Sequence, residues 1–294
     1  MADMQGGKFT HDATTAPNTD RVLPLFSLKG KTAIVSGASS GNIGVGIAQA
    51  FAEAGANVAI WYNTRKEAAE QAAAGIAKEY GVKCQAYQVD VVSPAECKAT
   101  IDSIVRSFNG RLDIFVANSG VAWTAGPMLD GPLDMYSKVV QTNLDGTYYS
   151  ARAAGEVFRR QKQEGTDIEG RPLDPPFKTG SFIATASMSG HIVNVPQLQA
   201  SYNASKAAVI HLCKSLAVEW VSFARANTVS PGYIITSISE FCDADTKQAW
   251  KDKIPMGREG EVGELKGAYL YLASDASSYT TGTDIAVDGG YSAP

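Results

Sequence analysis

The sequence predicts an α/β fold, namely a single-domain, Rossmann-type, doubly wound sheet of seven parallel strands with helices on both faces. Short β-rich apolar runs alternate with helix-length amphipathic stretches from Thr32 onward, which is the rhythm of βαβ units. A glycine cluster separates the first apolar run from the first helical stretch, as in dinucleotide-binding folds. The length of 294 residues suits one α/β body.

Each expected strand is a short apolar run, and each expected helix fills the interval between two runs. The strands are expected at Thr32–Ser36, Asn57–Trp61, Lys83–Gln88, Leu112–Ala117, Gly180–Ala184, Arg225–Val229 and Asp284–Val287. The helices are expected at 44–55, 65–80, 94–108, 133–163, 201–223 and 261–273. In such a sheet a ligand binds outside the carboxyl ends of the strands.

Two segments fall outside this rhythm. Residues 1–27 are polar and without periodicity, so we expect a flexible N-terminal arm, loose or ordered only against another subunit. Residues 161–179 are rich in Pro, Gly and charge and join a helix to a strand. We expect a surface loop insertion at the amino ends of the strands, with a partner contact as the alternative. The domain proper then spans residues 28–294.

Composition excludes several classes of protein. The net charge is −4, so no basic field is present to hold nucleic acid or anionic lipid. No run of 18 apolar residues occurs, and the N-terminus resembles neither a signal nor a transit peptide. The four cysteines lack C-x-x-C spacing and the three histidines do not cluster. We therefore expect a cytoplasmic protein with reduced thiols and no metal.

The run from Ser36 to Gly46 leads straight into a helix. Glycines there permit a tight turn and bring backbone N–H groups close to a pyrophosphate at the positive end of the helix. A plain strand–helix turn is the alternative, but the position in the first βα unit favours a cofactor site. The expected contacts are Gly37, Ser39, Gly41, Asn42, Ile43 and Gly44.

The end of the second strand indicates which dinucleotide binds. An NAD-preferring site usually places Asp or Glu there for the ribose 2′-hydroxyl, whereas this chain has Asn63, Arg65 and Lys66. An amide and two cations suit a 2′-phosphate, so we infer NADP(H). The alternative for the two cations is a solvated helix start.

The next two strand ends add further cofactor contacts. Asp90, followed by Val91, either accepts from the adenine amino group or caps the next helix. Asn118, Ser119 and Gly120 close the fourth strand, where glycine permits close approach of the backbone to the cofactor.

Tyr202 and Lys206 are four residues apart in a helical stretch, so both side chains share one face. A Tyr hydroxyl with a pKa of about 10 is a poor acid–base group at neutral pH. A nearby ammonium favours the phenolate and is expected to move that pKa toward neutrality.

A carbonyl held beside this tyrosine needs a hydroxyl donor. Ser187 and Ser189 both follow the fifth strand. Asn143 lies in the middle of an expected helix, where Asn is a poor helix former. This unfavourable helix propensity indicates a polar role for the Asn143 side chain. The alternative is a buried amide that only packs in the core.

Taken together, these motifs resemble the short-chain dehydrogenase/reductase family over residues 28–294. More closely, Ala59–Asn63, Ile192–Ala200 and Pro231–Ile234 are similar to a yeast and fungal subgroup of sorbose reductases and carbonyl reductases. The resemblance implies NADPH-dependent reduction of a ketone to a secondary alcohol.

Roles for individual residues follow from the same resemblance. Tyr202 would donate a proton to the carbonyl oxygen, Lys206 would lower the pKa of Tyr202 and hold the nicotinamide ribose, and Ser187 would hydrogen-bond the carbonyl. Asn143 would keep a water in a proton relay. The nicotinamide carboxamide would be fixed within the run that contains Pro231, Gly232, Ile234 and Thr236.

The chain departs from the family pattern in two places. Asn42 is inserted into the glycine motif, which leaves the phosphate contacts open. The family's serine lies three residues before a glycine, which selects Ser187, but also usually 13 residues before the tyrosine, which selects Ser189. Because the 191–200 segment reads as two residues longer in this subgroup, we favour Ser187.

The loops after strands four, five and six should form the substrate pocket. For each expected lining residue, the alternative is that it belongs to a lid or to the core. The expected lining residues are Trp123, Ser189, His191, Val195, Leu198, Tyr233, Phe241 and Trp250. The family's habit of pairing helices implies a homotetramer. A tailoring reductase for a ketone or imine of a natural product, and a non-catalytic NADP sensor, are the alternative functions.

Overall fold

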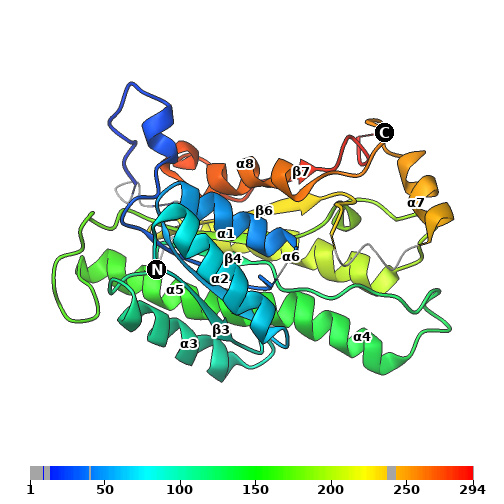
Figure 1. Ribbon diagram of the computed structural model, residues 1–294, viewed down its shortest axis with the longest axis horizontal. Coiled ribbons are helices and arrows are strands. Elements are labelled where there is room, and N and C mark those ends of the chain that lie inside the picture. Colours follow the sequence, from blue (N-terminus) through cyan, green and yellow to red (C-terminus); the bar gives the residue numbers. More distant parts are fainter. Residues whose placement is uncertain (1–8, 10–13, 40, 237–242, 294) are drawn as a thin grey trace.

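The computed structural model describes residues 9, 14–39, 41–236 and 243–293. Within them, seven strands form one sheet in the order β3-β2-β1-β4-β5-β6-β7, and every neighbouring pair is parallel (Figure 1). The predicted fold class is therefore confirmed. The strands are β1 (Thr32–Val35), β2 (Asn57–Tyr62), β3 (Cys84–Gln88), β4 (Ile114–Ala117), β5 (Gly180–Thr185), β6 (Ala224–Pro231) and β7 (Asp284–Val287).

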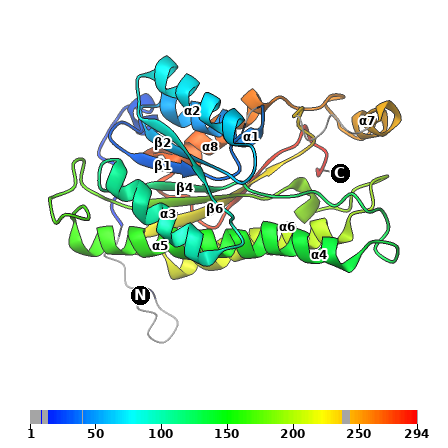
Figure 2. The same ribbon diagram turned by 60° about the horizontal axis from the view of Figure 1, so that its bottom comes forward.

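Helices cover both faces of the sheet, with α1, α2 and α8 on one face and α3 to α6 on the other (Figure 2). The helices are α1 (Ile43–Glu53), α2 (Lys66–Tyr80), α3 (Pro94–Ser107), α4 (Leu133–Val140), α5 (Gly146–Glu164), α6 (Ala200–Glu219), α7 (Ala244–Lys251) and α8 (Val262–Ala273). Strand order changes direction between β1 and β4, so the crevice of a doubly wound sheet opens at their carboxyl ends.

The helix expected over 133–163 is not one α-helix. A π-helical turn, Gln141–Asp145, separates α4 from α5. Asn143 lies in this turn, and its amide bonds to the loop after β4 rather than facing outward. A wider turn of this kind commonly marks a functional site. The sequence also missed α7, whose first turn is capped by Asp243.

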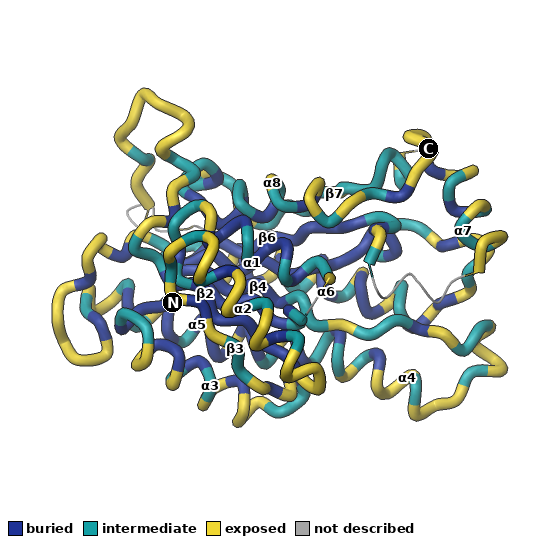
Figure 3. Tube along the Cα trace, in the orientation of Figure 1, coloured by how far each residue is buried: buried dark blue, intermediate teal, exposed yellow. Residues whose placement is uncertain are grey.

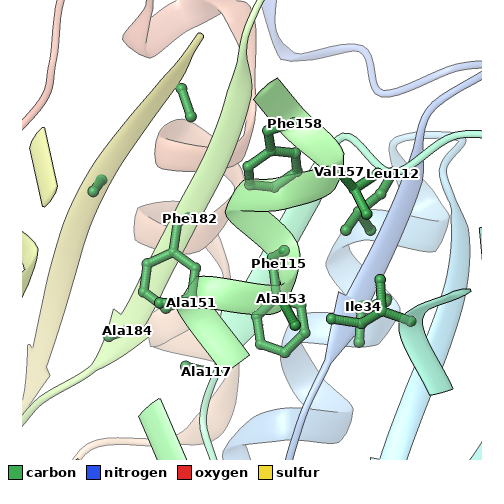
Figure 4. Packing of buried hydrophobic residues seen from close by; sticks show 14 of the residues in the cluster. Ile34, Leu112, Phe115, Ala117, Ala151, Ala153, Val157, Phe158, Phe182 and Ala184 are labelled. Atoms are coloured by element: carbon green, nitrogen blue, oxygen red, sulfur yellow. The ribbon is translucent and has the colours of Figure 1, made fainter. Parts of the chain in front are cut away.

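The core consists of two apolar layers, one on each face of the sheet (Figure 3). In the layer beneath α5, Phe115 of β4 stacks on Phe182 of β5 with ring centroids 5.9 Å apart, and Phe158 of α5 packs beside them (Figure 4). Aromatic pairs of this geometry contribute beyond the area they bury. These layers hold the strand ends at fixed positions for the site.

Charged and polar side chains close the amino edge of the sheet. Arg111 makes two hydrogen bonds to Asp113, of 2.6 and 2.8 Å, and both side chains are at most 5% exposed. The side-chain amide of Gln161 bonds to both the N–H and the C=O of Leu112. Helix α5 includes Gln161 and ends at Glu164, so the connection to β5 begins at Gly165. Arg111 also donates to the carbonyl of Pro175, which ties this loop to the edge.

Part of the N-terminal segment is ordered on the sheet's α1 and α8 side. Leu23–Phe26 form a 3-10 turn. This turn lines a groove together with residues of α1 and α8.

Candidate functional site

A cavity of about 410 Å³ lies at the carboxyl edge of the sheet. Most of the sequence-predicted cofactor and catalytic residues line it, although they come from segments far apart in the chain. They are Gly37, Ser39, Asn42, Ile43, Asn63, Arg65, Asp90, Val91, Asn118, Ser119, Gly120, Ser187, Tyr202, Lys206, Pro231, Gly232 and Thr236.

The glycine turn fits a closely approaching ligand. Gly37 has a φ of +64°, and a Cβ there would lie 2.8 Å from the Cα of Ser119. A Cβ on Gly44 would lie 2.6 Å from the carbonyl oxygen of Gly37. Gly44 therefore packs beneath the turn rather than lining the cavity. Gly41 has a φ of +63° and open space around it, so conformation alone requires glycine there.

The inserted Asn42 has a clear structural role. Its side-chain oxygen accepts from the N–H of Val45, which makes it the N-cap of α1. Its side-chain nitrogen donates to the carbonyl of Gly37 over 3.0 Å. Asn42 thus caps the helix and pins the glycine turn, so the insertion keeps the turn geometry intact.

The structure separates the two cations after β2. Arg65 lines the cavity. Lys66 does not, and its ammonium lies 3.9 Å from Glu70, with both side chains more than half exposed. Lys66 therefore behaves as a solvated residue at the start of a helix, which was the alternative considered for both cations. Arg65 remains available to a phosphate at the end of β2.

Asp90 does not cap α3. Ser93 caps that helix by accepting from the N–H of Glu96. The carboxylate of Asp90 instead accepts from the N–H of Val92, and the residue lines the cavity. A carboxylate is thus presented where an adenine amino group is expected.

The catalytic candidates meet at one end of the cavity. Tyr202 and Lys206 lie one turn apart on α6, and the Lys206 Nζ is 5.6 Å from the centroid of the Tyr202 ring. Ser187, directly after β5, lines the same cavity. Lys206 is 4% exposed, and within the described residues its one hydrogen bond is to the carbonyl of Thr185, over 2.8 Å.

The electrostatics of this pair differ from the sequence-based expectation. Burial raises the pKa of the Tyr202 phenol, and an interaction with the Ser187 hydroxyl opposes this only in part. Burial lowers the pKa of Lys206 to about 8. In this structure the pKa of Tyr202 is thus raised rather than moved toward neutrality, because desolvation of the phenol dominates.

Asn143 is almost fully buried and its amide is fully engaged. The side-chain oxygen accepts from the N–H of Val121, and the side-chain nitrogen donates to the Val121 carbonyl and the Ser205 hydroxyl. The side chain therefore ties the loop after β4 to α6, while its backbone carbonyl accepts from Thr147. It lies behind the cavity wall.

The structure distinguishes the two serines. Ser189 is 4% exposed and accepts from the Gln199 amide, and it does not line the cavity. The Ser187 hydroxyl accepts from the N–H of Ser189 and lies beside Tyr202. The geometry brings Ser187 rather than Ser189 to the tyrosine.

Within the described part of the chain, the residues expected to form the substrate pocket do not line this cavity. Trp123 is 2% exposed, with its indole N–H bonded to the Gly126 carbonyl. The His191 ring bonds to Asp284 over 2.9 Å. Each polar group thus has a partner outside this cavity, and a role for either ring in a substrate pocket stays a prediction.

The other expected pocket residues show a different pattern. Val195 and Leu198 are 49% and 51% exposed, on the loop after Ser187. Tyr233 stacks on Trp250 with ring centroids 4.0 Å apart. Phe241 lies outside the described residues.

Ile234 is absent from the cavity lining; it is buried and forms an isolated parallel bridge with Gly260, so its contact with the cofactor stays a prediction. Several other residues that line the cavity were not predicted from the sequence. Most of these adjoin strand ends already identified, and Lys138 and Thr142 are one turn apart on the α4 side. The missed residues are Tyr62, Thr64, Val89, Val121, Ala122, Lys138, Thr142, Thr185 and Ala186.

These observations fit a dinucleotide. The turn around Gly37 leaves no room for side chains, and α1 begins directly behind it at Ile43. Arg65 lines the cavity at the end of β2. Backbone N–H groups and a helix N-terminus are the usual hosts of a pyrophosphate. No group of three or more potential metal ligands occurs in the described part of the chain, nor does any described helix suit a membrane span.

The fold and the site together define a nicotinamide-dinucleotide oxidoreductase with a Tyr/Lys pair beside the cofactor crevice. The comparison with protein families agrees, since residues 37–292 match the family described as enoyl-(acyl carrier protein) reductase. The chain belongs to this branch of the short-chain dehydrogenase/reductase family.

Several fungal enzymes are similar to this chain. The chain is 67% identical over 291 residues to an L-xylulose reductase of Hypocrea jecorina, covering 99% of this chain and 100% of that protein. It is 52% identical to a sorbose reductase of Candida albicans, covering 96% and 94% respectively. Among solved structures, an NADPH-dependent 3-quinuclidinone reductase of Rhodotorula rubra matches with a TM-score of 0.86 at 40% identity, covering 97% of this chain and 100% of that one.

Proposed function

We propose that this chain is an NADPH-dependent reductase that converts a 2-ketose to the corresponding polyol, with L-xylulose as the first candidate substrate. The relatives named for xylulose and sorbose reduction support this class of substrate. The observation that carries the proposal is the meeting of Ser187, Tyr202 and Lys206 on the cavity that the glycine turn also lines.

The residues divide the chemistry among them. NADPH supplies the hydride when bound, with its phosphates at the turn from Gly37 to Ile43 and its 2′-phosphate at Arg65. Tyr202 donates the proton that the carbonyl oxygen acquires, and Ser187 holds that oxygen by a hydrogen bond. Lys206 places a positive charge beside the reacting oxygen. Asn143 positions the loop after β4 through its side-chain amide.

The protonation state of Tyr202 suits the acid role that reduction requires. Because burial raises the pKa of Tyr202, the phenol carries its proton at neutral pH and can donate it to the carbonyl oxygen.

A broader carbonyl reductase is the second candidate. The similarity to the 3-quinuclidinone reductase, a protein named for a bicyclic ketone, favours it. A reductase that tailors a natural product would also belong to this second candidate. The catalytic residues are the same for both candidates, so the shape of the preferred substrate distinguishes them.

The test is NADPH oxidation, followed at 340 nm, over a panel of ketones that includes L-xylulose, sorbose, fructose, quinuclidinone and aryl ketones. The proposal predicts the highest kcat/KM on a 2-ketose. A preference for quinuclidinone or aryl ketones would select the broader reductase, and NADPH binding without turnover of any ketone would contradict both.

We further propose a cytoplasmic homotetramer. Large apolar side chains are exposed along α4, α5 and α6, among them Tyr136, Tyr148 and Val218, and these are typical of subunit contacts. The N-terminal arm and the loop before β5 are proposed as peripheral segments of the same assembly. Sizing by light scattering tests it, and a monomer at micromolar concentration would contradict it.

A further inference from the structure

Tyr269 is a buried phenol that the proposed mechanism does not use. It lies on α8, is 0% exposed, and packs between apolar neighbours such as Leu265 and Leu272. A phenol in such a layer is costly unless its hydroxyl is hydrogen-bonded. Its oxygen lies 2.7 Å from the hydroxyl oxygen of Thr185, the last residue of β5.

The proton positions along this contact follow from its neighbours. The Thr185 hydroxyl also lies 3.0 Å from the side-chain oxygen of Asn118, and an amide oxygen only accepts. Thr185 has one hydroxyl proton, so it donates that proton to Asn118 and accepts from Tyr269. The phenol remains protonated, because burial raises its pKa.

The chain of hydrogen bonds continues to the glycine turn. The side-chain nitrogen of Asn118 donates to the carbonyls of Ser36 and Gly37, over 3.1 and 3.2 Å. The orientation of the Asn118 amide is therefore fixed from both sides. A donor on α8 thus orders the turn expected to receive the phosphates.

The backbone of the same threonine reaches the other half of the site. The carbonyl of Thr185 accepts from the Lys206 ammonium over 2.8 Å. Thr185 therefore holds the lysine by its backbone and the glycine turn by its side chain. Tyr269 holds Thr185 from behind, outside the cavity.

We propose that Tyr269 is a positioning residue of this reductase, which acts through Thr185 to fix both Lys206 and the glycine turn. The predicted effect on Lys206 and kcat rests on the proposed function. The predicted effect on the glycine turn can be measured as NADPH affinity, without turnover. A purely structural phenol would stabilise the fold and leave cofactor affinity and pH dependence unchanged.

The experiment compares Tyr269→Phe with Tyr271→Phe. Tyr271 lies on the same helix, and its hydroxyl makes a similar contact, 2.8 Å from the hydroxyl of Thr280, and neither residue lines the cavity. Each variant loses one neutral hydrogen bond, which is worth about 0.5–1.5 kcal/mol or about 2- to 12-fold in an equilibrium constant. The readouts are the NADPH Kd by fluorescence, kcat on the best ketone, and the pH at which kcat falls.

Tyr269→Phe should weaken NADPH binding and lower kcat by about 3- to 10-fold each, and should shift the pH at which kcat falls. Tyr271→Phe should leave all three unchanged. The proposal is overturned if the two variants lose similar thermal stability and both keep the wild-type Kd, kcat and pH profile. A wild-type enzyme that turns over no ketone would instead contradict the proposed function, while the Kd comparison would still decide the role of Tyr269.

A double-mutant cycle tests the route through Thr185. In a Thr185→Val background, Tyr269→Phe should cause no further loss of NADPH affinity, and a full additional loss would overturn the route. If Tyr269→Phe does not fold, Thr185→Ser and Thr185→Val take its place. Serine keeps the hydroxyl and should keep the affinity, valine should lose it, and equal affinities would overturn the proposal.

Discussion

The amino edge and the carboxyl edge of the sheet both bury cations, but these cations differ in their hydrogen-bond partners. At the amino edge, Arg111 pairs with the carboxylate of Asp113, and Arg225 donates to the carbonyls of Leu272, Ser274 and Thr280 around the end of α8. At the carboxyl edge, Lys206 is buried with one carbonyl as its hydrogen-bond partner in the described structure. Burial lowers its pKa to about 8.

This difference separates stability from chemistry. A buried ion pair that is fully bonded holds the fold and has nothing left to offer a ligand. A buried ammonium without a carboxylate raises the free energy of the folded state and leaves its charge available. Perturbed groups of this kind are concentrated at functional sites, and Lys206 is the one at the edge where the cofactor crevice opens. Burial also lowers the pKa of Arg225 at the amino edge, to about 10, but three carbonyls engage that guanidinium.

The largest effect is expected from Tyr202→Phe. Removing the phenol eliminates the proton donor, so kcat should fall by about 10²- to 10⁴-fold, while NADPH affinity and the unfolding temperature stay close to wild type. Steady-state kinetics and a fluorescence titration measure the two quantities. Turnover above a tenth of the wild-type rate would mean that another acid operates.

Arg111→Met should have the converse effect. It leaves Asp113 buried and unpaired, which costs about 3–5 kcal/mol of unfolding free energy. Turnover by the folded fraction should be unchanged, since Arg111 lies at the opposite edge from the cavity. Denaturant unfolding monitored together with activity measures both, and a loss of kcat at full folding would break the division between the edges.

Arg65→Glu should weaken NADPH binding by about 10- to 100-fold, since a charge-assisted hydrogen bond is worth about 1.5–3 kcal/mol. NADH binding should change much less. Lys66→Glu should have a smaller effect, because Lys66 lies outside the cavity, and Lys78→Glu, in the last turn of the same helix, is the control. Equal KM values for NADPH in wild type and Arg65→Glu would exclude Arg65 as the phosphate contact.

The pH dependence should show the lysine rather than the tyrosine. The Lys206 ammonium is present below its pKa of about 8 and is lost above it, whereas Tyr202 keeps its proton to higher pH because burial raises its pKa. Reduction should therefore be flat up to about pH 8 and then fall by about tenfold per pH unit. Circular dichroism at each pH controls for unfolding, and a profile that stays flat to pH 10 would contradict this assignment.

The cofactor half of the site was far more predictable than the substrate half. Strand ends and glycines fix Gly37, Asn118 and Gly232 by backbone geometry, which sequence spacing records directly. A loop side chain such as His191 depends on a partner, Asp284, that lies 93 residues away in the chain and that no local pattern reveals. The π-helical turn at Asn143 was hidden for the same reason, because the amide's partner Val121 lies 22 residues away. The fold class was predictable because the alternation of apolar runs is a property of the whole chain.

The most direct test of the difference between the edges is Lys206→Met, with turnover and thermal unfolding measured on the same sample at pH 7. The folded-state pKa of about 8 lies below the usual value near 10.5, so protonation at pH 7 costs the folded state about 3 kcal/mol. Methionine removes that cost, and the gain should shrink as the pH rises from about 8 toward 10.5. The account predicts an enzyme that has lost turnover but unfolds at an equal or higher temperature. Retained turnover, or a loss of stability like that of Arg111→Met, would contradict it.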